Sequence, residues 1–475
     1  MKNRLAILAA AVVLCACATS RPPEQVAAPA PARWHAPLPH GGAVRELAAW
    51  WQQWDDPLLL ELLVAAEAAS PDIAAAQSRI AQARATRAAA RSTLLPTLDA
   101  SASVQRGNNQ PPLPLSTISQ AGLQTAWEID LFGGNRAALA AARLREREAQ
   151  AGWHDARVAV AAETANTYVA LRTCERQLAV AENDARSRGE TARLAGLAEQ
   201  AGFTAPADAA LARASAAEAS ARATQQRAQC EIELKALVAL AGIEEPPLRT
   251  RLAGGWKQPA ADAQWLAVAA VPADVLSQRP DVYAAELEVA AASADVGSAQ
   301  AQRFPRLSLT GSIAAGVIRA GGSDTDAQTW SIGPLALSIP VFDAGRRAAN
   351  AEAAQARYEE AVAVYRARVR QAVREVEQAL VTLESSRLRG ADARAAAEGY
   401  RASFAATEAR WKSGLASQIE LEDARRILLA AETALVGLER ERLAAWVQLY
   451  RALGGGWKRP DTTLTTTNSP TPRTP

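Results

Sequence analysis

The sequence SPDIAAAQSRIAQARATRAAARSTLLPTL occupies residues 70–98, and a second version of it, RPDVYAAELEVAAASADVGSAQAQRFPRL, occupies residues 279–307. Each version starts with a Pro-Asp pair, continues through an Ala-rich helical stretch and ends with a Pro before a strand-like segment. The first prolines of the two versions are 209 residues apart (280 − 71), and so are the last (305 − 96). A solenoid repeat is only about 20–50 residues long, so the sequence predicts a duplicated half-protein.

Two later motifs continue the duplication. DLFGGNR at residues 130–136 corresponds to PVFDAGR at 340–346, with Phe342 lying 210 residues after Phe132. AGF at residues 201–203 corresponds to SGL at 413–415, with an offset of 212 residues between Gly202 and Gly414. The predicted organisation is a first repeat at 46–243, an equatorial linker at 244–275 and a second repeat at 276–457.

Each half contains two segments in which apolar and polar residues alternate, as in a half-exposed β-strand. Leu98 and Ala100 flank Asp99, for example, and loops rich in Gly, Asn or Pro separate the segments, including Gly321-Gly322-Ser323-Asp324. Pro334, inside the last segment, predicts a bulge or a local break in strand pairing. A transmembrane strand requires about ten residues of such alternation, although a soluble sandwich would show it too. The predicted strands are residues 96–106, 117–130, 305–318 and 328–341.

Long helical patterns follow the strands in both halves. A helix of about 65 residues is roughly 95 Å long at 1.5 Å per residue, so it needs helical neighbours along its whole length, as in a coiled-coil bundle or barrel. The charged run at residues 143–148 is interpreted as a solvated face. The predicted helices are residues 136–200, 205–241, 345–412 and 417–453.

The N-terminus has the pattern of a targeting segment, predicted as a signal peptide at residues 1–16. Lys2 and Arg4 precede a short apolar run that is too short to span a bilayer. Leu14 and Ala16 stand three residues and one residue before Cys17, which resembles a bacterial lipobox. We therefore expect a covalent lipid on Cys17 and a flexible Pro- and Ala-rich tether at 17–45; the alternative is an ordinary secretory signal cleaved nearby. The tail at 458–475 is predicted to be disordered.

The strands determine how such a chain could enter a membrane. The sequence has no other long apolar stretch, and in lipid only a closed barrel satisfies the backbone of strands. Four strands cannot close into a barrel, because a closed β-barrel needs about eight strands. A barrel of twelve strands leaves a channel. The predicted fold is therefore an α+β membrane protein, in which three copies form a 12-stranded transmembrane β-barrel and a long α-helical barrel.

Five motifs then carry a family resemblance. The chain resembles the TolC-like outer-membrane efflux proteins, and within them the OprM/NodT-type lipoproteins of RND tripartite pumps. The resemblance implies a homotrimer with a mixed equatorial domain in the bacterial outer membrane, extending into the periplasm. It also implies a periplasmic adaptor and an inner-membrane RND-type pump as partners, and drugs or other small toxic compounds as cargo. The motifs are Trp50-Trp51 with Asp56-Pro57, Trp127–Gly133, Arg279–Val282 with Phe304-Pro305, Pro340–Gly345 and Leu453–Trp457.

The resemblance also implies a periplasmic gate. By position, its apolar and anionic rings would be formed by Ile419 and Asp423, which share a helix face at i, i+4 spacing. An apolar ring seals a pore by dewetting, and a carboxylate ring favours cations. The alternative is a packed Ile419 and a solvated Asp423. The expected adaptor contacts are the hairpin tips, namely Ala201, Gly202, Phe203, Ser413, Gly414 and Leu415.

Two cysteines remain beyond the signal segment. Cys174 lies 28 residues before Gly202 (202 − 174) and Cys230 lies 28 residues after it (230 − 202). In an antiparallel hairpin these positions have the same height, and the periplasm is oxidising. We therefore predict a Cys174–Cys230 disulfide; the alternative is two buried thiols on different helix faces.

Several classes of function are disfavoured by composition. A net charge of +2 argues against nucleic-acid binding, and with three His in the chain no metal-ligand spacing, nucleophile–base set or phosphate loop is evident. We expect no enzyme activity, no metal and no cofactor beyond the lipid. The remaining alternatives are a type I secretion duct, a metal-ion exporter and a structural periplasmic lipoprotein without a pore.

Overall fold

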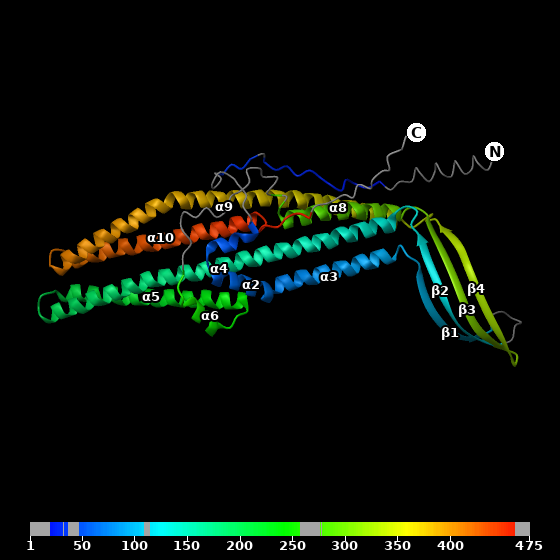
Figure 1. Ribbon diagram of the computed structural model, residues 1–475, viewed down its shortest axis with the longest axis horizontal. Coiled ribbons are helices and arrows are strands. Elements are labelled where there is room, and N and C mark those ends of the chain that lie inside the picture. The colour runs from blue at the N-terminus through cyan, green and yellow to red at the C-terminus, as the bar shows by residue number, and fades with distance from the viewer. Residues whose placement is uncertain are drawn as a thin grey trace, which may run out of the picture. The chain divides into compact units, whose positions relative to one another are not determined.

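The computed structural model describes residues 20–31, 33–36, 47–108, 115–256, 276 and 278–460 (Figure 1). The predicted signal peptide, Cys17, residues 257–275 of the predicted linker and residues 461–475 of the predicted tail lie outside the described residues. The chain divides into two compact units. Unit 1 contains Met1–Pro29, Ala75–Trp153 and Asp281–Arg368, and unit 2 contains Ala30–Ala74, His154–Pro280 and Val369–Pro475.

Unit 1 contains a four-stranded antiparallel sheet with the order β1-β2-β3-β4. Its strands are β1 (Thr97–Gly107), β2 (Ser116–Ile129), β3 (Arg306–Ala320) and β4 (Ser323–Ser338). The two halves of the chain therefore each contribute one hairpin, and β2 pairs with β3 where the hairpins meet. Both outer strands, β1 and β4, have an edge without a partner within the described sheet.

The last hairpin differs from the prediction. The predicted loop residues Ser323 and Asp324 belong to β4, because they pair with Ala320 and Arg319 and because Arg319 forms an ion pair with Asp324 (Nε–Oδ1 2.8 Å). The turn is only Gly321-Gly322, both at positive φ, which glycine adopts at little cost. At the other end β4 stops at Ser338, so residues 339–341 of the predicted strand lie outside it. The predicted irregularity at Pro334 is present as a register shift opposite Leu309–Gly311.

Four helical segments adjoin this sheet in unit 1: α3 (Pro71–Ser92), α8 (Pro280–Ala301) and the first parts of the 67-residue helices α4 (Gly134–Gln200) and α9 (Arg346–Lys412). They lie side by side in the order α3-α4-α8-α9 (Figure 1). Arg87 of α3 pairs with Glu146 of α4 at 2.8 Å, and alanines of α4 and α8 pack together. The apolar face of α8 packs on Ala354 and Tyr358 of α9.

The charged run at 143–148 is not a solvated face throughout, which corrects the prediction. Arg143 and Arg147 are exposed, but Glu146 is buried between Arg84 and Arg87 of α3. Arg145 pairs with Glu288 and Asp295 of α8 at 3.1 and 2.6 Å. A single helical pattern cannot reveal this arrangement, because the neighbouring helices decide which charges are covered.

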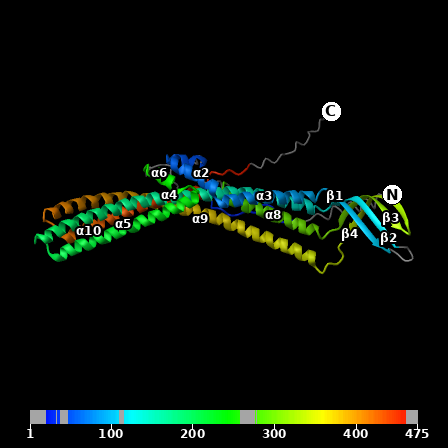
Figure 2. The same cartoon turned by 90° about the horizontal axis from the view of Figure 1, so that it is seen from below.

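Unit 2 contains two helical hairpins, formed by α4 with α5 (Pro206–Ala241) and by α9 with α10 (Gln418–Ala452) (Figure 2). Their core also includes η2 (Leu47–Trp54), α2 (Pro57–Ala69) and α6 (Glu245–Leu252). Trp50 is fully buried there and stacks on Tyr450 with ring centroids 4.9 Å apart. Asp56 caps α2 and accepts a hydrogen bond from the buried Tyr168 hydroxyl at 2.6 Å. The Trp50-Trp51 and Asp56-Pro57 motifs are thus structural.

The N-terminal segment is not a loose tether over its described part, which corrects a second prediction. In unit 1, the carbonyls of Pro22 and Pro23 accept hydrogen bonds from Ser293 and Tyr358. In unit 2, the Glu377 carboxylate accepts hydrogen bonds from the backbone N–H groups of His35 and Ala36 at 2.6 and 2.8 Å. Trp34 is buried in the core. A Pro- and Ala-rich composition does not distinguish a free linker from an extended segment held by its backbone.

Candidate functional site

The two hairpin tips have the same backbone design. At the first tip, Phe203 N–H donates to Ala198 O at 2.8 Å and Gly202 N–H donates to Glu199 O at 3.0 Å. At the second tip, the N–H groups of Leu415 and Gly414 make the equivalent bonds to Arg410 O and Trp411 O. This is the Schellman termination, which requires a left-handed residue at the glycine position. Gly202 and Gly414 have φ of +78° and +72°.

The residue after each glycine is apolar and exposed. Phe203 is 87% exposed and Leu415 is 71% exposed. In a Schellman motif this position usually packs back on its own helix, whereas here it presents apolar surface to the outside. Ala201 and Ser413 are exposed as well, so the six predicted tip residues form two exposed turns.

The two predicted gate residues lie on the exposed side of α10, close to its start. Ser417 begins this helix with a capping box, in which Ser417 and Glu420 bond reciprocally. Ile419 is 63% exposed and the Asp423 side chain is 60% exposed, one turn apart. The neighbouring Leu421 and Arg425 are buried on the opposite side. Ile419 and Asp423 are therefore available to contacts outside this chain.

Arg426 is a site residue that sequence reasoning missed. Its guanidinium Nη2 lies 3.1 Å from Asp423 Oδ1, and its side chain is 74% exposed. The i, i+3 spacing from Asp423 is the signal that could have identified it. A ring of Asp423 side chains would therefore carry compensating positive charge close by.

Behind the side of α10 that carries Ile419 and Asp423, a buried polar cluster joins the two hairpins of unit 2. Arg188 of α4 pairs with Asp184 at 2.9 Å and also with Glu422 of α10. Ser215 of α5 donates to Glu422 at 2.7 Å. Arg425 completes the cluster through Glu422 at 2.9 Å, and burial lowers the pKa of its guanidinium. Glu422 is thus the carboxylate shared by both hairpins, directly beside Asp423.

The first hairpin also has a covalent connection. Cys174 of α4 and Cys230 of α5 form a disulfide, with Cα atoms 5.4 Å apart. Both residues are buried and lie 28 positions from Gly202 in either direction. The equal spacing from the tip predicts that the two cysteines lie at the same height, and the structure places them on facing sides of the two helices.

The sheet of unit 1 has an apolar face and a polar face. One row of cross-strand neighbours contains Leu123, Ile313 and Trp330, and these side chains are 43%, 60% and 76% exposed. The adjacent row, on the opposite face, contains Asp99, Gln124, Ser312 and Ser331. Such exposure of large apolar side chains in a contiguous patch marks a surface that is covered by lipid or protein in the assembled molecule.

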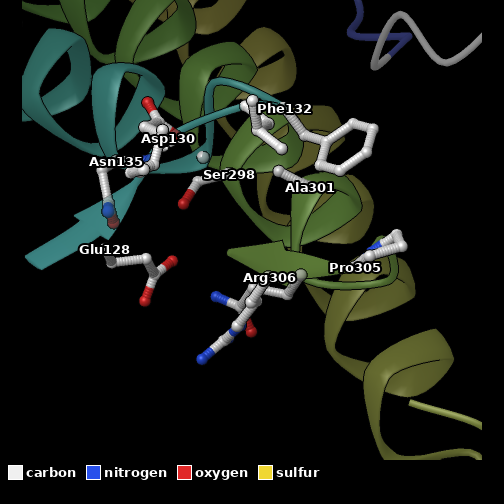
Figure 3. Close-up of a pocket in the computed structure, with 12 residues that line it drawn as sticks. Glu128, Asp130, Phe132, Asn135, Ser298, Ala301, Pro305 and Arg306 are labelled. Atoms are coloured by element: carbon white, nitrogen blue, oxygen red, sulfur yellow. Dashed lines mark hydrogen bonds between the residues drawn. The ribbon is translucent and has the colours of Figure 1, made fainter. Parts of the chain in front are cut away.

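A cavity of about 110 Å³ lies where the sheet joins the helices of unit 1 (Figure 3). Figure 3 shows Asp130 and Asn135 from the β2–α4 junction, with Ala301, Pro305 and Arg306 from the α8–β3 junction. The Asp130 carboxylate accepts hydrogen bonds from the backbone N–H groups of Asn135 and Arg136 at 3.2 and 2.9 Å and so caps α4. Asp343 caps α9 in the same way. We interpret the repeated Gly-rich junction as a strand-to-helix cap.

A carboxyl-rich contact connects α4 and α8. Burial raises the pKa of Glu148 to about 7, and the neighbouring Glu288 adds to this effect. Arg145 offsets part of it through its own ion pair with Glu288. The contact therefore favours a neutral Glu148. Among the described residues no group of three His, Cys, Asp or Glu side chains could hold a metal ion.

None of the described helices is long and apolar enough to cross a bilayer. The model of the outer membrane efflux protein family matches residues 62–243 and 271–455, which are most of the two repeats.

Individual relatives match over nearly their whole length. The pyoverdine export outer membrane protein OpmQ of Pseudomonas putida is 30% identical, with 96% of this chain and 98% of the relative covered. The outer membrane protein OprJ of Pseudomonas aeruginosa is also 30% identical, with 94% of each chain covered.

The fold matches a solved channel structure. The outer-membrane channel OprN superposes with a TM-score of 0.81 at 30% identity, over 92% of this chain and 99% of that chain. The names of OpmQ and OprN describe an export protein of the outer membrane and an outer-membrane channel. The chain belongs to the outer membrane efflux protein family, the TolC-like exit ducts of the bacterial outer membrane.

Proposed function

We propose that three copies of this chain form the exit duct of a tripartite efflux system. The observation that carries the proposal is the four-stranded sheet, which has an exposed apolar face and two free edges and continues into 67-residue helices. Three such sheets supply twelve strands, enough for an outer-membrane barrel with a channel. The helices of three copies would form the periplasmic tube.

The duct would be passive and would depend on partners. The exposed apolar residues Phe203 and Leu415 at the tips support docking of a periplasmic adaptor. The adaptor would connect the duct to an inner-membrane pump of the RND type, which supplies the energy. The cargo we propose is small toxic organic compounds. Two further Pseudomonas putida relatives, each 29% identical, are named for such cargo: the solvent efflux pump outer membrane protein SrpC and the toluene efflux pump outer membrane protein TtgI. A lipid on Cys17 would anchor each copy to the outer membrane.

Ile419 and Asp423 would form the periplasmic gate. Their exposure on one side of α10 supports a role in which three copies bring these side chains together around the pore. An apolar ring of Ile419 would exclude water, and a ring of Asp423 would favour cations. Arg426 would limit that preference, because it already pairs with Asp423.

The test is planar-bilayer conductance of the purified protein, with its native mass measured in parallel. We expect a trimer with small, cation-selective currents that grow in Asp423→Ala. Asp208→Ala is the matched control, because Asp208 is an exposed carboxylate at the start of α5 and near the first tip. Currents that respond equally to both variants, or to neither, would remove the gate assignment and leave the duct. A folded protein without any pore would favour a structural lipoprotein.

A further inference from the structure

The polar face of the four-stranded sheet carries few charges. Its rows of cross-strand neighbours consist mainly of Ser, Thr, Gln, Ala and Gly. Within the four described strands, the charged side chains on this face are Asp99, Glu128 and Arg306, and all three are exposed. Arg306 is therefore the only positive charge that these strands present on the polar face.

Glu128 and Arg306 are close neighbours on this face. Glu128 of β2 lies directly opposite Ser308 of β3, and Arg306 is two residues before Ser308 on the same strand. Such diagonal neighbours are within reach of long side chains. Neither the Glu128 nor the Arg306 side chain nevertheless forms an ion pair or a hydrogen bond with any described residue. Both charged groups are thus available to a ligand.

The cavity at the β2–α4 and α8–β3 junctions lies beside these two charges. Figure 3 shows Glu128 and Arg306 in the lower part of the view, with the neutral Asn135 and Ser298 above them. The volume of about 110 Å³ holds a small charged group or a few waters, but not a drug-sized molecule. The opening therefore offers a carboxylate, a guanidinium and neutral hydrogen-bonding groups to one end of a ligand.

The internal duplication shows that a junction of this kind forms without the charged pair. The corresponding positions in the other repeat are Ser338 (128 + 210) and Thr97 (306 − 209). The helix α9 nevertheless begins with an Asp343 cap, just as α4 begins with an Asp130 cap. The pair of charges is therefore not needed to start a long helix after a strand, which favours a role in binding.

We propose that Glu128 and Arg306 bind small zwitterionic organic molecules, with the ammonium group of the ligand at Glu128 and its carboxylate at Arg306. Arginine can hold a carboxylate through two parallel N–H···O bonds. A simple cation would be repelled by Arg306 and a simple anion by Glu128, whereas a zwitterion satisfies both. The inference rests on the proposed duct, in which the polar face lines the lumen, and it names a class of cargo that would contact the wall.

The exposure of both side chains fits a transport path. Exposed charge pairs bind weakly, because water competes for both partners. A conducting path needs sites that are favourable enough to enter and weak enough to leave. In a trimer, three such sites would lie at one level, where the long helices meet the sheet.

The first test measures binding and does not require a pore. The probe is para-(aminomethyl)benzoate, a rigid zwitterion, which is added to the full-length protein in detergent and observed by saturation-transfer NMR. We expect its dissociation constant to rise roughly three- to tenfold in Glu128→Gln and in Arg306→Gln, the loss of one exposed charge-assisted contact. Asp99→Asn is the matched control, because it removes an exposed carboxylate from the same face. Its opposite residue, Gln124, lies four residues from Glu128, about 13 Å along the strand.

Exchanging the charges tests the two contacts together. Each single reversal, Glu128→Arg or Arg306→Glu, should abolish binding of the probe, and the double reversal should restore it with the ligand turned round. Benzylamine and benzoate, which carry one charge each, should bind more weakly than the zwitterion. A wild type that does not bind the probe, or binds it no better than benzoate, would overturn the site. An equal loss in Asp99→Asn would overturn it as well.

The second test asks whether the site lies in the conduction path. Added to a planar bilayer from the side of the Gly321-Gly322 turn, the probe should reduce the wild-type current. The concentration for half-reduction should rise by the same factor as the dissociation constant in Arg306→Gln. A pore whose current ignores the probe would refute the contact with cargo and leave the duct. A protein that binds the probe but forms no pore would refute the duct and leave the site.

Discussion

The first hairpin, α4–α5, and the second hairpin, α9–α10, share one plan but differ in one covalent bond. Cys174 and Cys230 link the first hairpin covalently. The positions 28 residues from Gly414 in the second hairpin are Ser386 and Arg442. Ion pairs join the two helices in both hairpins, such as Arg227–Glu182 at 2.6 Å in the first and Arg401–Glu432 at 2.7 Å in the second. The disulfide is an additional restraint on the first hairpin, so we expect the second hairpin to be the more easily deformed.

The difference matters because the gate residues proposed above are on the second hairpin. A disulfide limits how far two helices can separate. We therefore expect the first hairpin to move less than the second, which it contacts through Glu422. Motion of α10 would be controlled mainly by the Glu422 cluster, and the following changes test that division in order of expected effect.

The largest effect is expected from Glu422→Gln, which removes the carboxylate shared by Arg188 and Arg425. Breaking a buried ion pair on one side typically costs about 3–5 kcal/mol, because the remaining charge is left uncompensated. We expect the free energy of unfolding to fall by about that amount and single-channel current to rise. Glu420→Gln is the control for current, since Glu420 lies at the same helix start but caps it. Equal currents in both variants would contradict the role of the cluster.

Removing the disulfide should affect stability but not the gate. Cys174→Ser with Cys230→Ser opens a loop with a sequence separation of 56 residues and should lower the free energy of unfolding by about 2–4 kcal/mol. Current and ion selectivity should stay at wild-type values, because the gate residues are on the other hairpin. Mass spectrometry of non-reduced peptides checks that the bond is present in the wild type. A change in ion selectivity would show that the first hairpin also influences the gate.

A smaller, pH-dependent effect on the free energy of unfolding is expected at Glu148. Burial raises the pKa of Glu148 from 4.5 to about 7, so the folded state favours the neutral carboxyl. Stability from this group is complete below pH 4.5 and is lost as the pH rises through 7. Glu148→Gln should therefore stabilise the protein at pH 8, on the order of 1 kcal/mol for a partly exposed group, and leave it unchanged at pH 4. The free energy of unfolding measured at both pH values checks this, and equal effects of Glu148→Gln at pH 4 and pH 8 would contradict it.

The smallest effect on stability is expected at the tips. Phe203→Ser and Leu415→Ser change side chains that are 87% and 71% exposed. The free energy of unfolding should therefore change by less than about 0.5 kcal/mol. Efflux in cells should nevertheless fall, because an adaptor would lose apolar contact area. Conductance of the isolated duct provides the control and should not change. Efflux that stays at the wild-type level in the double variant would contradict adaptor docking at these tips.

Much of the fold was predictable because strong local signals mark its elements. Proline and glycine punctuate both halves, and the period of the apolar residues changes from two to about 3.6 at Gly134 and Arg346, where α4 and α9 begin. The shift of β4 towards Ser323 was not predictable from alternation alone. It depends on the two-residue turn at Gly321-Gly322 and on the Arg319–Asp324 pair.

The site was predictable only in part. Cys174 and Cys230 are equally far from Gly202 along the sequence, and in an antiparallel hairpin this spacing predicts that they lie at the same height. The structure shows that they also face each other and form a disulfide. The contact of Arg188 with Glu422 has no such signal, because 234 residues separate the two side chains and packing of the hairpins brings them together. The partial burial of the 143–148 run has the same origin.

The N-terminal segment is held mostly through its main chain. Pro22 and Pro23 offer carbonyl groups, and His35 and Ala36 offer N–H groups. Main-chain atoms are the same in every amino acid, apart from the N–H that proline lacks. The four hydrogen bonds therefore depend on the backbone path and on the acceptor Glu377 more than on the side chains of the segment. We expect exchanges of its exposed side chains to leave this path unchanged, whereas loss of the buried Trp34 should disturb it.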